Sequence, residues 1–471
     1  MVRTLCSVLF LVCCTVAQAQ VLPVFWGLTP TGGANNKGTL FRVNSDGGAF
    51  VTVYHFDDLS GYGPEGTLCL ASNGKLYGTT NSGGAGSIAA GTLFSYDPQA
   101  EVFNKLVDFD LSNGGFGWGG PVAHPNGYIY GATYGGGNGG GSIYRVDPAT
   151  DTYTIQYGLT QSTDGGGITS QLTLASDGKF YGACAYGGTF NAGTLFRFDP
   201  ATSTFTKLHD LADGAGGSTP YGSLCDAGNG RFYGTTFEGG NADKGVLFKY
   251  VPATNTFTIL QHFDGSNGQQ PWNAPVVAGP DLLFGVTASG GTNGNGVIYS
   301  VVPSTDAVQT RYIFPPLVGG ALMGNLLAGD DGLLYGLASF GGTNFQGLFY
   351  RFDPATNTVT GLHSFLSALD GATPRGDLVA AGTITGVREA MTEGSFELWP
   401  SPSRGVLHID LGVNWRSGTR VRISDALGAT VYEASLVAPR NTLQVDAAPG
   451  AYTVSVITAE RTSVRRWLLE R

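Results

Sequence analysis

The sequence predicts an all-β protein, a seven-bladed β-propeller followed by a small β-sandwich. Three observations predict this fold. Glycine accounts for 75 of the 471 residues and only 13% of residues are charged, a composition that favours turns and strands over helices. A unit of 51 to 53 residues recurs seven times. After about residue 387 the repeat stops and glycine becomes scarce, which indicates a second domain.

The first 19 residues are typical of a secretory signal peptide. Arg3 precedes an apolar run from Leu5 to Val16, and the run ends in the small-x-small pattern Ala17-Gln18-Ala19. We therefore expect a mature chain that begins at Gln20. A lipoprotein is the less favoured alternative, because the cysteines inside the apolar run lack a small residue just before them.

The cysteines and the charge exclude several classes of protein. Three cysteines, Cys69, Cys184 and Cys225, remain in the mature chain, an odd number with no Cys-x-x-Cys pair, so we expect buried thiols and neither a disulfide framework nor a zinc site. The net charge of -10 argues against binding to nucleic acid. No mature segment has 18 consecutive apolar residues, so we expect no transmembrane helix, and we expect no cofactor.

Each repeat predicts four antiparallel strands, called A to D here. Asn-Gly or Asp-Gly usually joins strand A to strand B, a Gly-Gly loop joins B to C, and Asp-Pro often begins the turn between C and D. A lone four-stranded sheet leaves both faces exposed, so the copies must stack, and radial stacking into a propeller is favoured over an open solenoid. Strand B carries the aromatic-glycine pair that marks each copy: Trp26-Gly27, Tyr77-Gly78, Tyr130-Gly131, Tyr181-Gly182, Tyr233-Gly234, Phe284-Gly285 and Tyr335-Gly336.

The last copy of strand A predicts how the ring closes. This copy, "GDLVAAG" at 376–382, follows the seventh strand D, whereas the first repeat has no strand A of its own. We therefore expect Asp377 to Ala381 to pair beside Val24 to Leu28, so that both ends of the propeller, residues 20–386, share one sheet and leave no free edge.

The repeat resembles a known family. Its pattern G-x-LYGTT-x-x-GG-x-x-x-x-GTLF-x-x-DP is similar to the GloVer-type tandem repeats of bacterial exported proteins over about residues 21–382. The resemblance implies a propeller-like domain of undetermined molecular function. The sixth copy departs most, with Phe284 in place of Tyr and Pro280-Asp281 in place of Asn-Gly.

The C-terminal region predicts a linker at 387–397 and a small β-sandwich at 398–471. Its Pro400-Ser401-Pro402 start, "SDALGATVYE" at 424–433, "PGAYTVSV" at 449–456 and basic final strand resemble the C-terminal sorting domain of the type IX secretion system of Bacteroidota. The resemblance implies recognition of 398–471 by that machinery and export across the outer membrane, with the protein secreted or attached to the cell surface. A generic accessory sandwich is the alternative.

Catalytic and metal-binding patterns are weak. The strand D histidines, His55, His209, His262 and His363, fall in two registers that point to opposite faces of their sheets, which argues against a histidine ring. The Gly-rich loops lack the Lys-Ser/Thr of a phosphate-binding loop. The tripeptide Arg375-Gly376-Asp377 resembles an adhesion motif, but we expect it in the closing strand. We predict no catalytic residues and no metal ligands.

The residues that differ between copies give the candidate site. One variable residue precedes each strand A, and if strand A is innermost these seven mouth residues surround the opening of the channel: Glu65, Trp118, Thr169, Tyr221, Trp272, Met323 and Arg375. The loops between strands B and C add Tyr134, Tyr186 and Phe340, together with Phe237, Glu238 and the amides Asn35, Asn36, Asn191, Asn241, Asn293 and Asn344. Aromatic faces beside amides suit sugar rings. The alternative is that these aromatic side chains pack between blades.

We therefore expect a non-catalytic binding protein, secreted or surface-attached, that captures a glycan or protein ligand at the channel mouth. A carbohydrate-active enzyme, a lyase or glycosidase, is the first alternative, with Glu65 and Glu238 as the only candidate pair of carboxylates. A purely structural surface protein is the second. Fold alone does not select among these functions.

Overall fold

The computed structural model describes residues 22–86, 88–228, 230–316, 318–381, 397–399, 406–411, 418–424, 429–438, 440–448, 450–458 and 462–469. The chain divides into two compact units. One unit is Val24–Gly382, and the other contains the strands after residue 396. The predicted signal peptide and most of the predicted linker lie outside the described residues.

Seven four-stranded antiparallel sheets make up the described part of the first unit, and they are numbered here in chain order. Sheet 1 contains β3 (Val51–His55), β2 (Thr39–Asn44), β1 (Val24–Thr29) and β30 (Val379–Ala380). Sheet 2 contains β4 (Cys69–Leu70), β5 (Leu76–Thr80), β6 (Thr92–Asp97) and β7 (Val102–Asp108). Sheet 3 contains β8 (Val122–Ala123), β9 (Ile129–Thr133), β10 (Gly139–Asp147) and β11 (Thr152–Thr160).

The other four sheets repeat this order of strands A, B, C and D. Sheet 4 contains β12 (Thr173–Leu174), β13 (Phe180–Cys184), β14 (Thr194–Asp199) and β15 (Thr204–Asp210). Sheet 5 contains β16 (Cys225–Asp226), β17 (Phe232–Thr236), β18 (Val246–Val251) and β19 (Thr256–His262). Sheet 6 contains β20 (Val276–Gly279), β21 (Leu282–Val286), β22 (Val297–Val302) and β23 (Ala307–Ile313). Sheet 7 contains β25 (Leu327–Ala328), β26 (Leu334–Ala338), β28 (Leu348–Asp353) and β29 (Thr358–Ser364).

The predicted pairing between the two ends of the repeat region is present. Strand β30 pairs with β1, with Ala380 opposite Phe25 and Val379 opposite Trp26. The amide of Ala381 also donates to the Val24 carbonyl at 3.3 Å. The last copy of strand A therefore completes the first sheet, as the offset in the sequence predicts.

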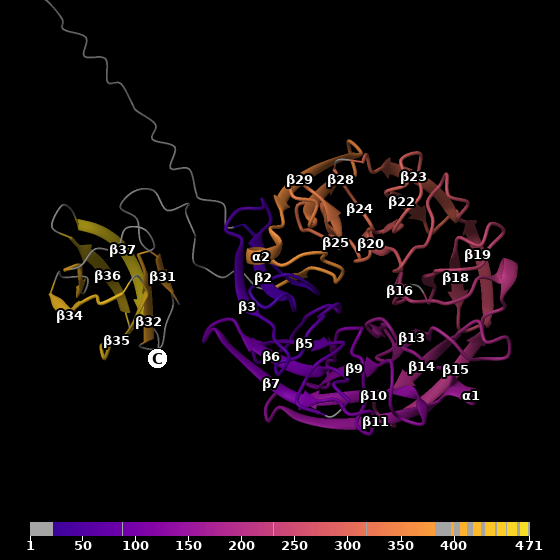
Figure 1. Ribbon diagram of the computed structural model, residues 1–471, viewed down its shortest axis with the longest axis horizontal. Helices are drawn as coiled ribbons and strands as arrows, with labels where there is room; N and C mark the ends of the chain where they lie inside the picture. Colours follow the sequence, from indigo (N-terminus) through magenta and orange to yellow (C-terminus); the bar gives the residue numbers. More distant parts are fainter. Residues whose placement is uncertain are drawn as a thin grey trace, which may run out of the picture. The chain divides into compact units, whose positions relative to one another are not determined.

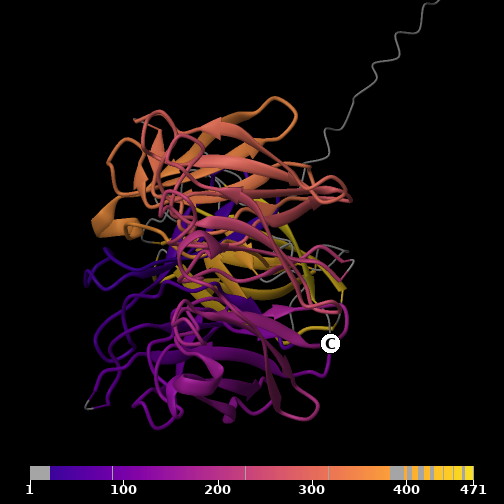
Figure 2. The ribbon, with the colours of Figure 1, turned by 90° about the vertical axis from the view of Figure 1, so that its right-hand side faces the viewer.

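The seven sheets are arranged around a common axis, with the D strands at the outer rim and the A strands near the centre (Figure 1). Figure 2 shows this ring of sheets edge-on, with the strands running from one face to the other. Neighbouring A strands contact one another, as β4 and β8 do, and β12 and β16. Strand A is thus the innermost strand, which is the condition for the predicted site.

Two kinds of aromatic packing fill the sheets and the gaps between them. The ring of the aromatic-glycine pair lies between sheets, as where Tyr181 stacks on Phe232 with ring centroids 4.2 Å apart. The glycine lies beneath the aromatic ring directly opposite it on strand C: Gly182 faces Phe196, and a Cβ on Gly182 would lie 2.5 Å from the Phe196 ring. The glycine therefore makes room within its own sheet, while the preceding ring contacts the next sheet.

Short turns follow the sequence signals. In the turn between strands A and B, Asn73 and Asp177 each accept a hydrogen bond from the amide two residues on, at 3.0 Å, and the following Gly74 and Gly178 have positive φ angles. In the turn between C and D, Asp199 of the Asp-Pro pair accepts a bond from the Ala201 amide in the same way. Asx turns at Asn-Gly, Asp-Gly and Asp-Pro thus set the strand spacing.

The connections between strands D and A carry the few other elements. They are α1 (Gln161–Asp164), the 3₁₀ helix Gly214–Gly216, α2 (Ser367–Asp370) and β24 (Gly319–Gly320), which pairs with β27 (Phe340–Gly341) in the loop between strands B and C of sheet 7. Elsewhere isolated bridges tie the same connection to the end of strand B, for example Gly166 to Tyr186 and Ser218 to Glu238. These bridges hold the segment just before each mouth residue.

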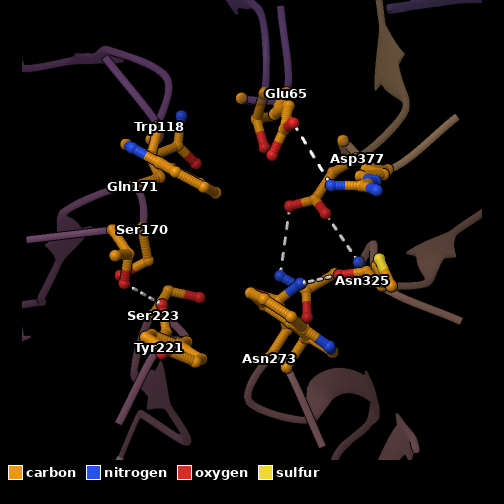
Figure 3. A pocket seen from close by; sticks show the side chains of 17 residues that line it. Glu65, Trp118, Ser170, Gln171, Tyr221, Ser223, Asn273, Asn325 and Asp377 are labelled. Atoms are coloured by element: carbon orange, nitrogen blue, oxygen red, sulfur yellow. Dashed lines mark hydrogen bonds and ion pairs between the residues drawn. The ribbon is translucent and has the colours of Figure 1, made fainter. Parts of the chain in front are cut away.

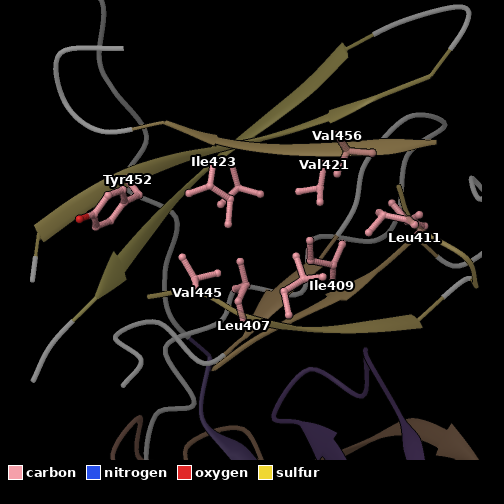
Figure 4. Close-up of a cluster of buried hydrophobic side chains, with 11 residues drawn as sticks. Leu407, Ile409, Leu411, Val421, Ile423, Val445, Tyr452 and Val456 are labelled. Atoms are coloured by element: carbon pink, nitrogen blue, oxygen red, sulfur yellow. The ribbon is translucent and has the colours of Figure 1, made fainter. Parts of the chain in front are cut away.

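The C-terminal unit has two antiparallel sheets. One holds β31 (Glu397–Trp399), β32 (Val406–Asp410) and β35 (Arg440–Gln444), and the other holds β34 (Thr430–Ser435), β33 (Arg420–Ser424), β36 (Gly450–Ile457) and β37 (Thr462–Leu469). Alternate residues of both sheets, such as Leu407 and Ile423, form a buried core between them (Figure 4). This arrangement is a small β-sandwich.

Candidate functional site

All seven mouth residues line one cavity at the centre of the ring (Figure 3). Each of the seven is half-buried, and the cavity measures about 70 Å³. A space of that size admits only a few water molecules and is far below the several hundred Å³ of a typical small-molecule pocket. The cavity can therefore take a small chemical group, while anything larger must lie across its mouth.

The backbone around the cavity is packed sheet to sheet. A Cβ on Gly120 would lie 1.6 Å from the Thr67 carbonyl oxygen, and one on Gly376 would lie 2.5 Å from the Gly66 carbonyl oxygen. Equally close approaches or hydrogen bonds join the remaining neighbours: Gly119 with Ser170, Thr169 with Tyr221, Gly222 with Asn273, Asn273 with Met323, and Gly324 with Gly376. These contacts connect every sheet with the next, including sheet 7 with sheet 1.

Hydroxyl groups on strand B or directly after it position two of the mouth segments. Thr79 donates to the carbonyls on both sides of Trp118, those of Gly117 and Gly119, at 3.1 and 2.9 Å. Ser339 donates to the Pro374 carbonyl, just before Arg375, at 2.8 Å. Thr79 and Ser339 are both buried, so water does not compete for these hydrogen bonds.

Aromatic rings form one side of the mouth. Tyr221 and Trp272 stack with ring centroids 4.8 Å apart and an interplanar angle of 16°, and Phe237 packs against both. Trp118 contacts Tyr134, which in turn contacts Tyr186, at centroid distances of 6.4 and 5.8 Å. Two aromatic groups, the first on sheets 5 and 6 and the second on sheets 3 and 4, thus lie around Thr169.

Charged side chains form the opposite side of the mouth. Arg375 Nη1 lies 3.2 Å from Glu65 Oε1, and this ion pair joins the segment before β30 to the segment before β4. Burial raises the pKa of Glu65, and Arg375 acts in the opposite direction. The Nε of Arg375 is buried without a hydrogen-bond partner.

A third charged group lies below this pair. Asp377 accepts hydrogen bonds from the Asn325 backbone amide at 2.6 Å and from Asn325 Nδ2 at 3.1 Å (Figure 3). Burial raises the pKa of Asp377, while these bonds and one from the Thr67 hydroxyl lower it. The Oδ1 of Asn325 is buried and has no hydrogen-bond partner.

Sequence reasoning did not assign this second layer of residues to the site. The cavity is also lined by side chains one or two residues after a mouth residue: Thr67, Ser170, Gln171, Ser223, Asn273, Asn325 and Asp377. Sequence variation between the copies could have identified most of these residues, because the position two residues after each mouth residue varies between copies just as the mouth position does.

The predicted loop residues do not line the cavity. Tyr134 contacts Trp118, Tyr186 contacts Tyr134, and Phe340, which is 49% exposed, lies on β27. Glu238 accepts a hydrogen bond from Thr219 and is not among the lining residues. Several loop amides support the backbone instead: Asn36 and Asn191 have positive φ angles and accept bonds from Gly32 and Gly187, while Asn35 and Asn344 donate to the Phe56 and Phe365 carbonyls.

The Arg-Gly-Asp tripeptide and the three cysteines have structural roles in the ring of sheets. The Arg-Gly-Asp tripeptide is held by the Glu65 ion pair and the Asn325 hydrogen bonds. Cys69, Cys184 and Cys225 are buried free thiols, and burial raises the pKa of each to about 12. In the described part of the chain, no three His, Cys, Asp or Glu side chains converge as metal ligands, and no helix has the length and apolar character to cross a membrane.

Comparison with solved structures shows likeness in fold. The crystal structure of a putative 6-phosphogluconolactonase from Bacteroides uniformis aligns with a TM-score of 0.51 and 16% identity, covering 75% of this chain and 98% of that one. A putative 6-phosphogluconolactonase from Bacteroides fragilis gives 0.50 and 13%, covering 76% and 98%. TolB from Acinetobacter baumannii gives 0.40 and 15%, covering 61% of this chain and 63% of the length of TolB.

Comparison with protein families covers nearly the whole sequence. No curated protein matches this chain. The Gloeobacter/Verrucomicrobia repeat matches residues 18–174 and 168–396, and the secretion system C-terminal sorting domain matches residues 397–470. The sorting domain indicates export across the outer membrane by type IX secretion, to the cell surface or the extracellular space. The chain belongs to the Gloeobacter/Verrucomicrobia repeat family and carries a C-terminal sorting domain for secretion.

Proposed function

We propose that residues 20–386 form a closed seven-bladed β-propeller that binds an extracellular glycan at its channel mouth without catalysis. Residues 1–19 are removed on export, and residues 398–471 direct the protein outward. The observation that carries the proposal is the lining of the cavity. The residues that the copies share build the sheets and turns, whereas the seven mouth residues, which differ between copies, all line this cavity.

The aromatic side of the mouth supports a glycan as ligand. Sugar rings present flat apolar faces that stack on Trp and Tyr, and their hydroxyls pair with the amides and hydroxyls beside them. The Tyr221–Trp272 stack and Trp118 supply the faces, and Gln171, Ser223 and Asn273 supply the polar groups. Because the cavity is too small for a sugar ring, the glycan would lie across the mouth.

The charged side of the mouth supports binding over catalysis. A glycosidase needs two carboxylates set on either side of a bond, one of them protonated and free to donate. Glu65 is instead held by Arg375, Asp377 accepts bonds from Asn325, and Glu238, the second carboxylate of the predicted pair, is outside the cavity lining. These groups serve the ring closure and the shape of the mouth.

A glycan array tests the proposal. The mature chain should bind one or more glycans, and Trp118→Ala and Trp272→Ala should each weaken binding by roughly tenfold or more, since stacking and buried aromatic area are lost. Phe345→Ala is the matched control, because Phe345 is 60% exposed and does not line the cavity. Absence of any glycan binding would overturn the proposal, and turnover of a polysaccharide that Glu65→Gln abolishes would establish an enzyme instead.

A further inference from the structure

We propose that the cavity at the channel mouth receives a protonated amine, so that the glycans bound are those with free, unacetylated amino sugars. This inference rests on the proposed glycan function and names its substrate class. Three features of the described residues support it: the size of the cavity, its balance of charge and acceptors, and its aromatic wall.

The size of the cavity selects a small group. At about 70 Å³ it excludes a sugar ring but admits a substituent that replaces a few waters. A primary ammonium has three hydrogen-bond donors and a compact charge, which suits a narrow space whose walls offer acceptors. A glycan stacked across the mouth could insert such a substituent without moving the packed backbone around it.

The charges and acceptors of the lining favour a cation. Two carboxylates, Glu65 and Asp377, line the cavity against one guanidinium, Arg375, and no Lys or His is among the lining residues that the structure describes. Asn325 adds a buried Oδ1 without a partner. Burial raises the pKa of both carboxyls, and an entering ammonium would favour their charged forms.

The aromatic wall adds to this preference. Trp118, Tyr221 and Trp272 all line the cavity, and aromatic faces attract cations, most strongly at Trp. An anionic ligand is less favoured than a cation, because Glu65 already pairs with Nη1 of Arg375, Nε is the one buried donor of that guanidinium without a partner, and an incoming carboxylate would meet Asp377. A neutral acetamido group would leave the cavity charge uncompensated.

Titration calorimetry with matched oligosaccharides tests the inference. The full mature chain is titrated with a β-1,4-glucosamine hexamer and with its fully N-acetylated counterpart at about pH 6, where amines are largely protonated. We expect the free-amine hexamer to bind at least about tenfold more tightly. Asp377→Asn and Glu65→Gln should each reduce that ratio substantially, toward one.

The control is Asp330→Asn, which makes the same change of charge at an exposed position in the turn between β25 and β26 and should keep the wild-type ratio. Circular dichroism and thermal melting establish that each variant is folded. Equal binding of the two hexamers, or a ratio that survives both Asp377→Asn and Glu65→Gln, overturns the amine assignment and leaves the glycan function standing. Failure of both hexamers, with no other glycan bound on the array, overturns the glycan function itself.

Discussion

At the scale of single residues, the glycine of each aromatic-glycine pair is required by the residue opposite it. In all seven sheets the strand B glycine is paired with a Phe or Tyr on strand C, and a Cβ there would lie 2.4 to 2.6 Å from the nearest carbon of that ring. Side chains are not found this close, so a substitution must displace a buried ring. The repeated glycine is thus a packing requirement rather than a turn signal.

Gly182→Ala is therefore expected to destabilise the ring of sheets. The new methyl group would overlap the Phe196 ring, which is fully buried, and overpacking of this kind costs about 1–3 kcal/mol. Urea denaturation followed by fluorescence measures the free energy of unfolding. Gly279→Ala is the control, because the nearest atom to its Cβ would be 3.8 Å away. Equal stability of the two variants would show that the ring moves aside without cost.

Asp377 makes stability depend on pH. Burial raises its pKa, so the folded protein holds the proton more tightly than the unfolded chain does. Its contribution to stability is therefore greatest below the ordinary Asp value of about 3.9 and declines as pH rises through the raised folded value. Asn at position 377 stays neutral and therefore avoids this loss of stability at higher pH. If the side-chain amide of Asn325 rotates, the Oδ1 of Asn325, which has no partner, can accept a hydrogen bond from the new Asn side chain.

The measurement is the melting temperature of Asp377→Asn and wild type between about pH 3 and pH 7. We expect the variant to melt higher near pH 7 and the difference to shrink toward pH 3. A difference that does not change with pH would mean that the carboxyl titrates alike in the folded and unfolded chain.

At the scale of elements, the two-residue strand β30 contributes to the stability of the whole ring of sheets. It completes the edge of β1, brings the buried Leu378 into a cluster with Phe25 and Tyr335, and places Gly376 against Gly66 of the next sheet. Without it, β1 would present unpaired backbone groups, and an open edge of this kind promotes self-association.

A chain that stops after Pro374 should show this effect. Compared with a chain that stops after Gly386, which keeps β30, it should melt at a lower temperature by several degrees and elute partly as oligomers. Scanning calorimetry and size-exclusion chromatography make the comparison. Identical melting and elution would mean that the ring needs no closing strand.

The sequence predicts elements and register better than it predicts the site. The offset copies of strand A predict the pairing of β30 with β1, and the repeat alignment predicts that Glu65, Trp118 and Arg375 meet. Both follow from symmetry, because equivalent positions in a ring share one radius. The ion pair of Arg375 and the hydrogen bonds of Asp377 are not symmetric, since each depends on which residues happen to be neighbours after closure. Loop aromatics such as Phe340 are outside the cavity lining, and symmetry does not fix their position because the loops differ in sequence between copies.

At the scale of the whole molecule, the ring of sheets and the C-terminal sandwich each have their own hydrophobic core, and each has its own role. The ring of sheets presents the mouth residues, and the sandwich carries the sorting function with its own buried cluster. Export should then depend on the fold of the sandwich, since a secretion machine that recognises this domain recognises its surface. A matched pair of substitutions within the sandwich separates folding from surface chemistry.

Ile423→Asp and Val437→Asp each replace an aliphatic side chain with a carboxylate, the first at a buried position and the second at an exposed one. Ile423 is 0% exposed in the sandwich core, where an unpaired carboxylate costs several kcal/mol, whereas Val437 is 84% exposed. In a bacterium with type IX secretion, we expect Ile423→Asp to remove nearly all of the protein from the cell surface and medium, and Val437→Asp to leave its amount near wild type. Immunoblots of cell, surface and medium fractions give the distribution. Normal export of Ile423→Asp would show that a short linear signal suffices, because the packed core that joins the two sheets would then be dispensable for recognition.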